Sequence, residues 1–167
     1  DDLNLILTEA NVHYAMGNID KFKELLEFAT EKDPKNAELQ YNLGVIAADA
    51  NDFDNAKKYY ERAITLKPDY VDAYINLAVV ILDPEVKIIN EMNSLIDCNR
   101  ASCLDDYNNL KIQKRELYVK AIPLIEKALE FNPNSLPLLK KMAEMLPAVE
   151  RYDDEKKYKE LIKSLEQ

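Results

Sequence analysis

Hydrophobic residues recur along this chain at intervals of three and four positions, in blocks separated by short runs of Asp, Asn, Gly and Pro. This spacing places the apolar side chains on one face of an α-helix, and the polar runs mark helix ends. The pattern predicts antiparallel helix pairs. The first pair is about 3–16 with 19–32, and the second is about 36–50 with 53–66. The third pair extends from Val71 to Phe131, and the fourth is about 135–147 with 152–166. Because the 167 residues include only 2 glycines, we predict an all-α fold.

The first two helix pairs are related by a spacing of 34 residues, the distance from Pro34 to Pro68. A fixed period of this length is typical of stacked helical repeats. In the second pair, Ala56, Tyr60 and Ala63 are spaced by four and three, so they share one helix face. The alanines allow a neighbouring backbone to approach closely, and the tyrosine fills the remaining space.

The second pair resembles the tetratricopeptide repeat (TPR) in its residues Leu43, Gly44, Ala56, Tyr60, Ala63 and Pro68. The resemblance implies a right-handed helical solenoid of about four helix pairs, forming one domain over residues 1–167. The repeats would cover about 3–36, 37–70, 71–135 and 136–167, the last being a capping repeat with a polar outer face. The first repeat has the character of an interior one, which leaves open whether further repeats precede residue 1.

The third repeat contains an insertion at 84–114 that also follows helical spacing. The positions with this spacing are Val86, Ile89, Met92 (or Asn93) and Ile96 on the outgoing arm. On the return they are Tyr107, Leu110, the stem of Lys114 and, just after the insertion, Leu117 and Ala121. They predict that the third pair is extended into a long hairpin with its tip near Asp97–Asp105, which resembles some bacterial TPR proteins. Pro84 leaves two alternatives open, a kink in the outgoing arm or a new helix that begins there.

The two cysteines, Cys98 and Cys103, lie at the predicted tip of the hairpin. One interpretation is a disulfide that closes the tip, which would indicate an oxidising compartment such as the periplasm or the exterior. The other is a pair of free thiols, as is usual in the cytoplasm. A zinc site needs about four ligands, and the single His13 is far away in the sequence. We therefore predict no metal site and leave the compartment open.

The sequence contains no pattern that predicts catalysis. It has no glycine-rich phosphate loop and no nucleophile motif, so we expect neither an enzyme nor a cofactor. The net charge of −9 and the lack of a basic stripe argue against nucleic-acid binding. No apolar run approaches the ~20 residues of a transmembrane helix, so we expect no membrane insertion. His13 is expected to be packed or half-exposed.

The resemblance places a concave groove on the first helix of each pair. Carried over to this sequence, the groove positions are Asn4, Leu7, Asn11, Tyr14, Glu38, Tyr41, Asn42, Val45, Asp49, Asp72, Ile75, Asn76 and Val79. Relatives that grip acidic C-terminal tails use a clamp of Lys, Asn, Asn, Lys and Arg, and the residues here are Leu7, Asn11, Asn42, Asp72 and Asn76. The asparagines are retained and the cations are absent, which argues against an acidic tail. At each groove position, helix packing or solvation is an equally good interpretation.

We therefore predict a protein–protein interaction module. It would bind a peptide or partner protein of neutral or basic character in the concave groove or along the extended hairpin. Asn side chains can hydrogen-bond an extended peptide backbone, and tyrosines are frequent interface anchors. The alternative is a structural role, as a scaffold segment of a longer repeat array or of a self-assembling protein. The sequence leaves the oligomeric state open.

Overall fold

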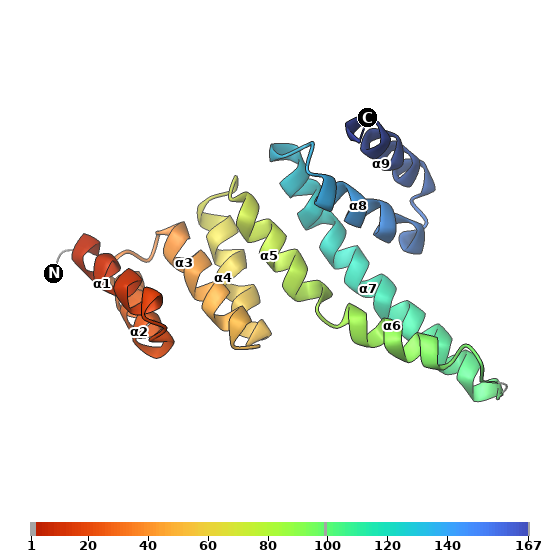
Figure 1. Cartoon of the computed structure of the whole chain (residues 1–167), viewed down its shortest axis with the longest axis horizontal. Helices are drawn as coiled ribbons and strands as arrows, with labels where there is room; N and C mark the ends of the chain where they lie inside the picture. Colours follow the sequence, from red (N-terminus) through yellow and green to blue (C-terminus); the bar gives the residue numbers. More distant parts are fainter. Residues whose placement is uncertain (1–2, 99, 167) are drawn as a thin grey trace. The chain divides into compact units, whose positions relative to one another are not determined.

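The computed structural model describes residues 3–98 and 100–166, and every regular element among them is a helix (Figure 1). The helices are α1 (Leu3–Ala15), α2 (Ile19–Lys32), α3 (Ala37–Asp49), α4 (Phe53–Leu66), α5 (Val71–Leu82), α6 (Glu85–Ser94), α7 (Ala101–Phe131), α8 (Leu136–Met145), the 3-10 helix η1 (Leu146–Val149) and α9 (Tyr152–Leu165). The chain divides into two compact units, of which the first ends at Val80 and the second begins at Ile81. Each unit is described by itself below.

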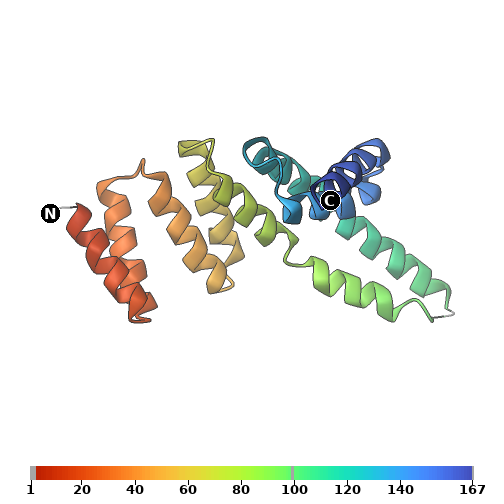
Figure 2. The ribbon, with the colours of Figure 1, turned by 45° about the horizontal axis from the view of Figure 1, so that its top comes forward.

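In the first unit, α1 packs against α2 and α3 packs against α4, and Figure 2 shows each pair side by side. One apolar cluster joins the first three helices, with the buried members Ile6, Ala10, Phe22, Leu26, Ala29, Leu39, Leu43 and Ile46. Ala56 and Ala63 of α4 are fully buried, and Tyr60 between them is 2% exposed. The small–aromatic–small face predicted for the second pair is therefore a packing face.

The helix ends follow local side-chain chemistry. Asn36 begins α3, and its Oδ1 accepts hydrogen bonds from the backbone N–H groups of Glu38 at 3.1 Å and Leu39 at 3.3 Å. Asp52 begins α4 in the same way and accepts from the N–H of Asn55 at 3.3 Å. Such side chains satisfy N–H groups that have no partner inside the helix.

The turn inside a repeat uses a residue with left-handed backbone geometry. Gly17 after α1, Asn51 after α3 and Glu150 after η1 have φ values of 75°, 59° and 64°. Gly17 and Asn51 are one repeat period apart in the sequence. Glycine and asparagine adopt this geometry more readily than other residues, so two of the three turns have a suitable residue.

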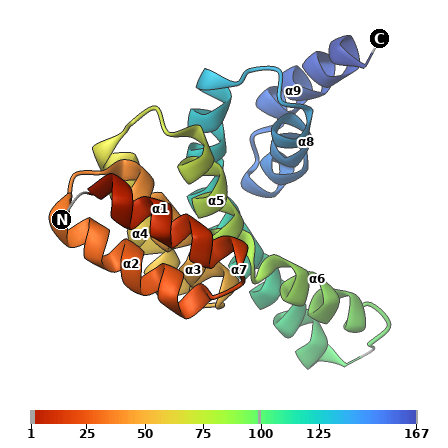
Figure 3. The ribbon, with the colours of Figure 1, turned by 60° about the vertical axis from the view of Figure 1, so that its left-hand side comes forward.

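In the second unit, α6 runs along the first part of α7 and forms an arm closed by a short loop (Figure 3). Its own small core consists of Ile88, Met92 and Leu110, with Leu95, Tyr107 and Leu117 packed against it. The C-terminal part of α7 packs against α8, and α8 packs against α9. No described residue of α9 is fully buried.

The arm differs from the sequence prediction in which face of α6 is buried. Val86 and Ile96 were expected to face α7, but each is 67% exposed. Met92 is buried as predicted, but the other buried residues of α6 are Glu85 and Ile88. The buried positions have the same helical spacing as the predicted ones. Because the first of them is the charged Glu85, the sequence did not indicate that this face is buried. Of the two alternatives for Pro84, the structure has a break, because α5 ends at Leu82 and α6 begins at Glu85.

Candidate functional site

The cationic side chains of the first unit are distributed unevenly among its helices. The first helix of each repeat, α1, α3 and α5, contains no lysine or arginine. By contrast, α2 and α4 each contain three cationic side chains. Glu38, Asp49 and Asp72, all at predicted groove positions, lie on the cation-free helices. We call the predicted groove positions of α1, α3 and α5 the inner face, and it is acidic.

Six of the predicted groove residues surround one hollow in the first unit. The hollow has a volume of about 360 Å³ and is lined by Asn11, Tyr14, Ile19, Phe22, Tyr41, Asn42, Val45, Ile46 and Asp49. Its wall is apolar and aromatic, with two amides and one carboxylate. This combination suits an apolar side chain of a ligand whose backbone is hydrogen-bonded by the amides.

Tyrosine rings lie beside this hollow. The ring centroid of Tyr41 is 5.8 Å from that of Tyr60 and 4.9 Å from that of Tyr70. The side-chain amide of Asn76 donates a hydrogen bond to Tyr41 Oη at 3.0 Å, which fixes the Tyr41 ring. Burial raises the pKa of Tyr60 to about 12. The pKa of Tyr70 is also raised to about 12, first by burial and then by the nearby Glu38, Tyr41 and Asp72.

Other predicted groove residues lie outside the lining of the hollow. They are Asn4, Leu7, Glu38, Asp72, Ile75, Asn76 and Val79. Leu7 packs against the apolar cluster of the first three helices, so helix packing explains it. His13 is half-exposed, and its Nδ1 lies 3.3 Å from Nδ2 of Asn18.

The sequence prediction missed four residues in and next to the hollow. Ile19, Phe22 and Ile46 line it, and Tyr70 contacts Tyr41. Ile19 and Phe22 lie in the first turn of α2, directly after the turn at Gly17. Tyr70 immediately precedes α5. A prediction that included residues flanking each first helix would have found Tyr70 and Ile19.

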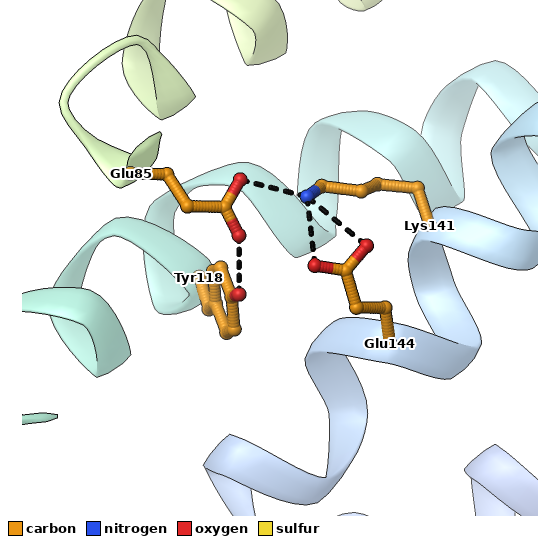
Figure 4. A network of polar contacts seen from close by, with 4 residues as sticks. All are labelled: Glu85, Tyr118, Lys141 and Glu144. Carbon is orange, nitrogen blue, oxygen red and sulfur yellow. Dashed lines mark hydrogen bonds and ion pairs between the residues drawn. The ribbon is translucent and has the colours of Figure 1, made fainter. Parts of the chain in front are cut away.

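The second unit contains a buried polar cluster that the sequence did not predict (Figure 4). Glu85 at the start of α6 is 7% exposed and accepts a hydrogen bond from Tyr118 Oη of α7. Lys141 Nζ of α8 lies 2.7 Å from the other oxygen of Glu85 and 3.2 Å from the carboxylate of Glu144. Burial alone would raise the pKa of Glu85, but hydrogen bonds from Lys141 and Tyr118 outweigh it and hold that pKa below its usual value. The cluster ties α6 to α7 and α8.

The arm of the second unit is closed at its tip. A disulfide joins Cys98 and Cys103, whose Cα atoms are 6.1 Å apart. Among residues 3–98 and 100–166, no group of three or more His, Cys, Asp and Glu side chains is arranged to hold a metal ion. None of the helices described is long and apolar enough to cross a membrane.

A profile of the tetratricopeptide repeat matches residues 7–71 and 46–83. Residues 7–83 are tetratricopeptide repeats, and the chain has the fold of TPR proteins. Its sequence is also similar to that of the Protein O-mannosyl-transferase Tmtc3 of Drosophila melanogaster, with 42% identity over 53 residues. That segment is 32% of this chain and only 6% of the fly protein.

Solved TPR structures have the same fold. The crystal structure of MamA aligns over 99% of this chain and 78% of its own, with a TM-score of 0.65 and 19% identity. A thermophilic TPR protein of Thermus thermophilus aligns over 99% and 75%, with a TM-score of 0.56 and 16% identity. An O-GlcNAc transferase mutant of Thermobaculum terrenum aligns over 86% and 22%, with a TM-score of 0.56 and 15% identity. TPR proteins generally mediate protein–protein interaction or scaffolding and are generally not catalytic.

Proposed function

We propose that the inner face of the first unit binds an extended segment of a partner protein that is neutral or basic. The observation that carries this proposal is the uneven distribution of cations: α1, α3 and α5 contain no lysine or arginine, whereas α2 and α4 contain three each. Glu38, Asp49 and Asp72 give the inner face a negative potential, which attracts cationic partners and repels acidic ones.

The hollow between α1, α2 and α3 supplies the apolar part of the interaction. Its volume of about 360 Å³ accommodates a large apolar side chain, and Val45 and Tyr14 lie on its wall. Asn11 and Asn42 line the same hollow. Each amide offers both a donor and an acceptor, which matches the N–H and C=O groups of an extended backbone. Apolar anchoring then contributes affinity, and charge selects the partner.

The test begins with peptides selected by display from a random library against the whole chain. We expect selected peptides to be neutral or basic and to bind with micromolar affinity. Val45→Arg fills the hollow with a cation, so it should weaken binding at least about tenfold. The matched control is Thr65→Arg on α4, because Thr65 is exposed and its hydroxyl bonds only to Glu61 of the same helix.

Charge is tested separately with Asp49→Lys and the matched control Glu61→Lys on α4. Only the first should weaken basic peptides, and raising the salt concentration from about 0.05 to about 0.3 M should weaken them further. The proposal would be overturned if Val45→Arg left the affinity for the selected peptides unchanged, or if acidic tails bound with micromolar affinity. Self-association of the chain that Val45→Arg abolishes would overturn it as well, because the inner face would then join copies of the chain.

A further inference from the structure

Two tyrosines, one on the inner face of the first unit and one next to it, form an aromatic shelf. Tyr41 belongs to α3 and Tyr70 immediately precedes α5, and their ring centroids are 4.9 Å apart. Asn76 of α5 holds Tyr41 through the hydrogen bond to its Oη at 3.0 Å. Both rings are half-exposed. The shelf therefore has a fixed geometry and remains accessible from outside.

Two carboxylates border this shelf. Glu38 lies three residues before Tyr41 on α3, and Asp72 lies four residues before Asn76 on α5. Residues with these separations are neighbours on one helix face. Because Asn76 contacts Tyr41, both carboxylates lie on the side of their helices that carries the shelf. The pKa of Tyr70 is raised by burial and by the nearby Glu38, Tyr41 and Asp72. This is consistent with a position of both carboxylates beside the shelf.

In the part of the chain that the structure describes, no ion pair neutralises the two carboxylates beside the shelf. Over residues 3–98 and 100–166, the recorded ion pairs use other carboxylates than Glu38 and Asp72. One cation does approach the shelf, since Lys67 Nζ lies 4.9 Å from the Tyr70 ring centroid. It contacts the aromatic ring and lies outside ion-pair distance of both carboxylates. Aromatic faces attract cations in this way.

We propose that Tyr41, Tyr70, Glu38 and Asp72 form a subsite for an arginine side chain of the bound partner. The subsite rests on the proposed function and names the residue type that the inner face selects. A guanidinium group is planar, stacks on aromatic rings and donates paired hydrogen bonds to carboxylates. A lysine ammonium group lacks the flat surface and the paired donors, so arginine fits the combination of a shelf and two carboxylates better.

The direct test titrates the whole chain with Nα-acetyl-arginine amide and with the citrulline equivalent, which is uncharged and of the same shape. Binding is followed by NMR on the side-chain amide of Asn76 and the tyrosine ring signals. We expect a saturable shift with the arginine probe and at least about tenfold weaker binding of the citrulline probe. Nα-acetyl-lysine amide should be intermediate.

Isosteric variants locate the binding. The double variant Glu38→Gln/Asp72→Asn should weaken the arginine probe at least about tenfold. The matched control is Glu61→Gln/Asp54→Asn on α4, which removes the same charge from exposed positions and should change nothing. Equal binding of arginine and citrulline, insensitivity to the double variant, or lysine binding as tightly as arginine would each overturn the assignment.

The selected peptides separate failure of the subsite from failure of the proposed function. Each arginine in a peptide is replaced in turn by citrulline, and one position should lose at least about tenfold in affinity. If peptides depend on Val45 yet tolerate every citrulline, the subsite is wrong and the inner face still binds partners. If the arginine probe binds as expected but no peptide depends on Val45, the proposed function is wrong while the subsite is retained.

Discussion

Gly44 of α3 faces the ring of Tyr60 without room for another carbon atom. A Cβ atom at this position would lie 2.6 Å from Cε1 and 2.7 Å from Cδ1 of that ring. Tyr60 is 2% exposed, and the Tyr41 ring lies against it. The tyrosine therefore has little freedom to move away, and the first unit depends on a glycine at this point of helix contact.

Gly44→Ala should lower the free energy of unfolding by about 1–3 kcal/mol through overpacking, measured by urea denaturation. Gly17→Ala is the control. Its Cβ would meet nothing within 4 Å, but the φ of 75° should cost about 1 kcal/mol in strain. In a Tyr60→Leu background, the cost of Gly44→Ala should fall and that of Gly17→Ala should persist. If Tyr60→Leu left the destabilisation by Gly44→Ala unchanged as well, the contact between position 44 and the Tyr60 ring would be contradicted.

Glu150 has left-handed backbone geometry with φ 64°, although it has a Cβ atom. Its carboxylate lies 3.4 Å from Arg115 in an exposed pair, and such pairs contribute little. Glu150→Gly should therefore raise the free energy of unfolding by about 1 kcal/mol. Glu160→Gly in the middle of α9 should lower it by about the same amount, because glycine is unfavourable there. Destabilisation by both variants would mean that the Arg115 contact outweighs the backbone strain.

We predict that Glu85 makes the second unit sensitive to acid. Its pKa is held below the unfolded value, so its stabilisation is complete above the unfolded pKa and is lost as the pH falls through the folded one. Glu85→Gln should lower the free energy of unfolding by about 1–3 kcal/mol near pH 7. The difference from the native chain should shrink as the pH approaches about 3. Glu91→Gln, in an exposed pair at 3.9 Å, is the control and should have little effect at any pH.

At the scale of helices, the α6–α7 arm has few buried side chains of its own. Ile88, Met92 and Leu110 form its core, and the Cys98–Cys103 disulfide closes its tip. A small core gives a low local stability, so cross-linking the ends of the tip contributes a large share. The arm should therefore open more readily than the helix pairs of the first unit.

Reduction of the disulfide tests this. Closing a loop this short stabilises by about 2 kcal/mol in the chain-entropy view, so reduction should speed amide hydrogen exchange in α6 and the first turns of α7. Exchange in α3 and α4, measured in the same sample, is the control and should not change. Cys98→Ser should reproduce the effect without reductant. Equal exchange in the reduced and oxidised arms would show that the apolar core alone holds them together.

The sequence predicted helix ends well because they depend on neighbouring residues. Asn36 and Asp52 cap the helices that follow them, and Pro34 and Pro68 separate the pairs. The buried face of α6 could not be predicted, because Glu85 becomes acceptable inside only through Tyr118 and Lys141, which are far away in the sequence. The contact of Tyr41 with Tyr70 likewise depends on how adjacent repeats pack. Local chemistry fixed the elements, and long-range partners decided the polar cluster and the shelf.

At the scale of the whole chain, we predict that residues 84–114 are an insertion into a regular repeat. The C-terminal part of α7 contains Ala121, Ile125 and Ala128, which are buried like the corresponding residues of α4. Pro133 then follows the end of α7 as Pro68 follows the end of α4. If the insertion is an arm grafted between the halves of a repeat, these residues should fold without it.

Excision of 84–114, with Asp83 joined to Arg115, tests this and restores the 34-residue spacing of Pro68 and Pro133. The shortened chain should remain helical by circular dichroism and unfold cooperatively, because each repeat is held mainly by its neighbours. It should be less stable than the native chain, since Tyr118 and Lys141 lose Glu85. Adding Lys141→Met, which removes a cation that has lost Glu85 and retains only Glu144, should recover part of that loss. The same substitution in the intact chain should destabilise, because there it breaks the cluster.

The shortened chain could instead be unfolded or aggregated, with or without Lys141→Met. That result would show that the arm is part of the core, and the interpretation of 84–114 as an insertion would be wrong.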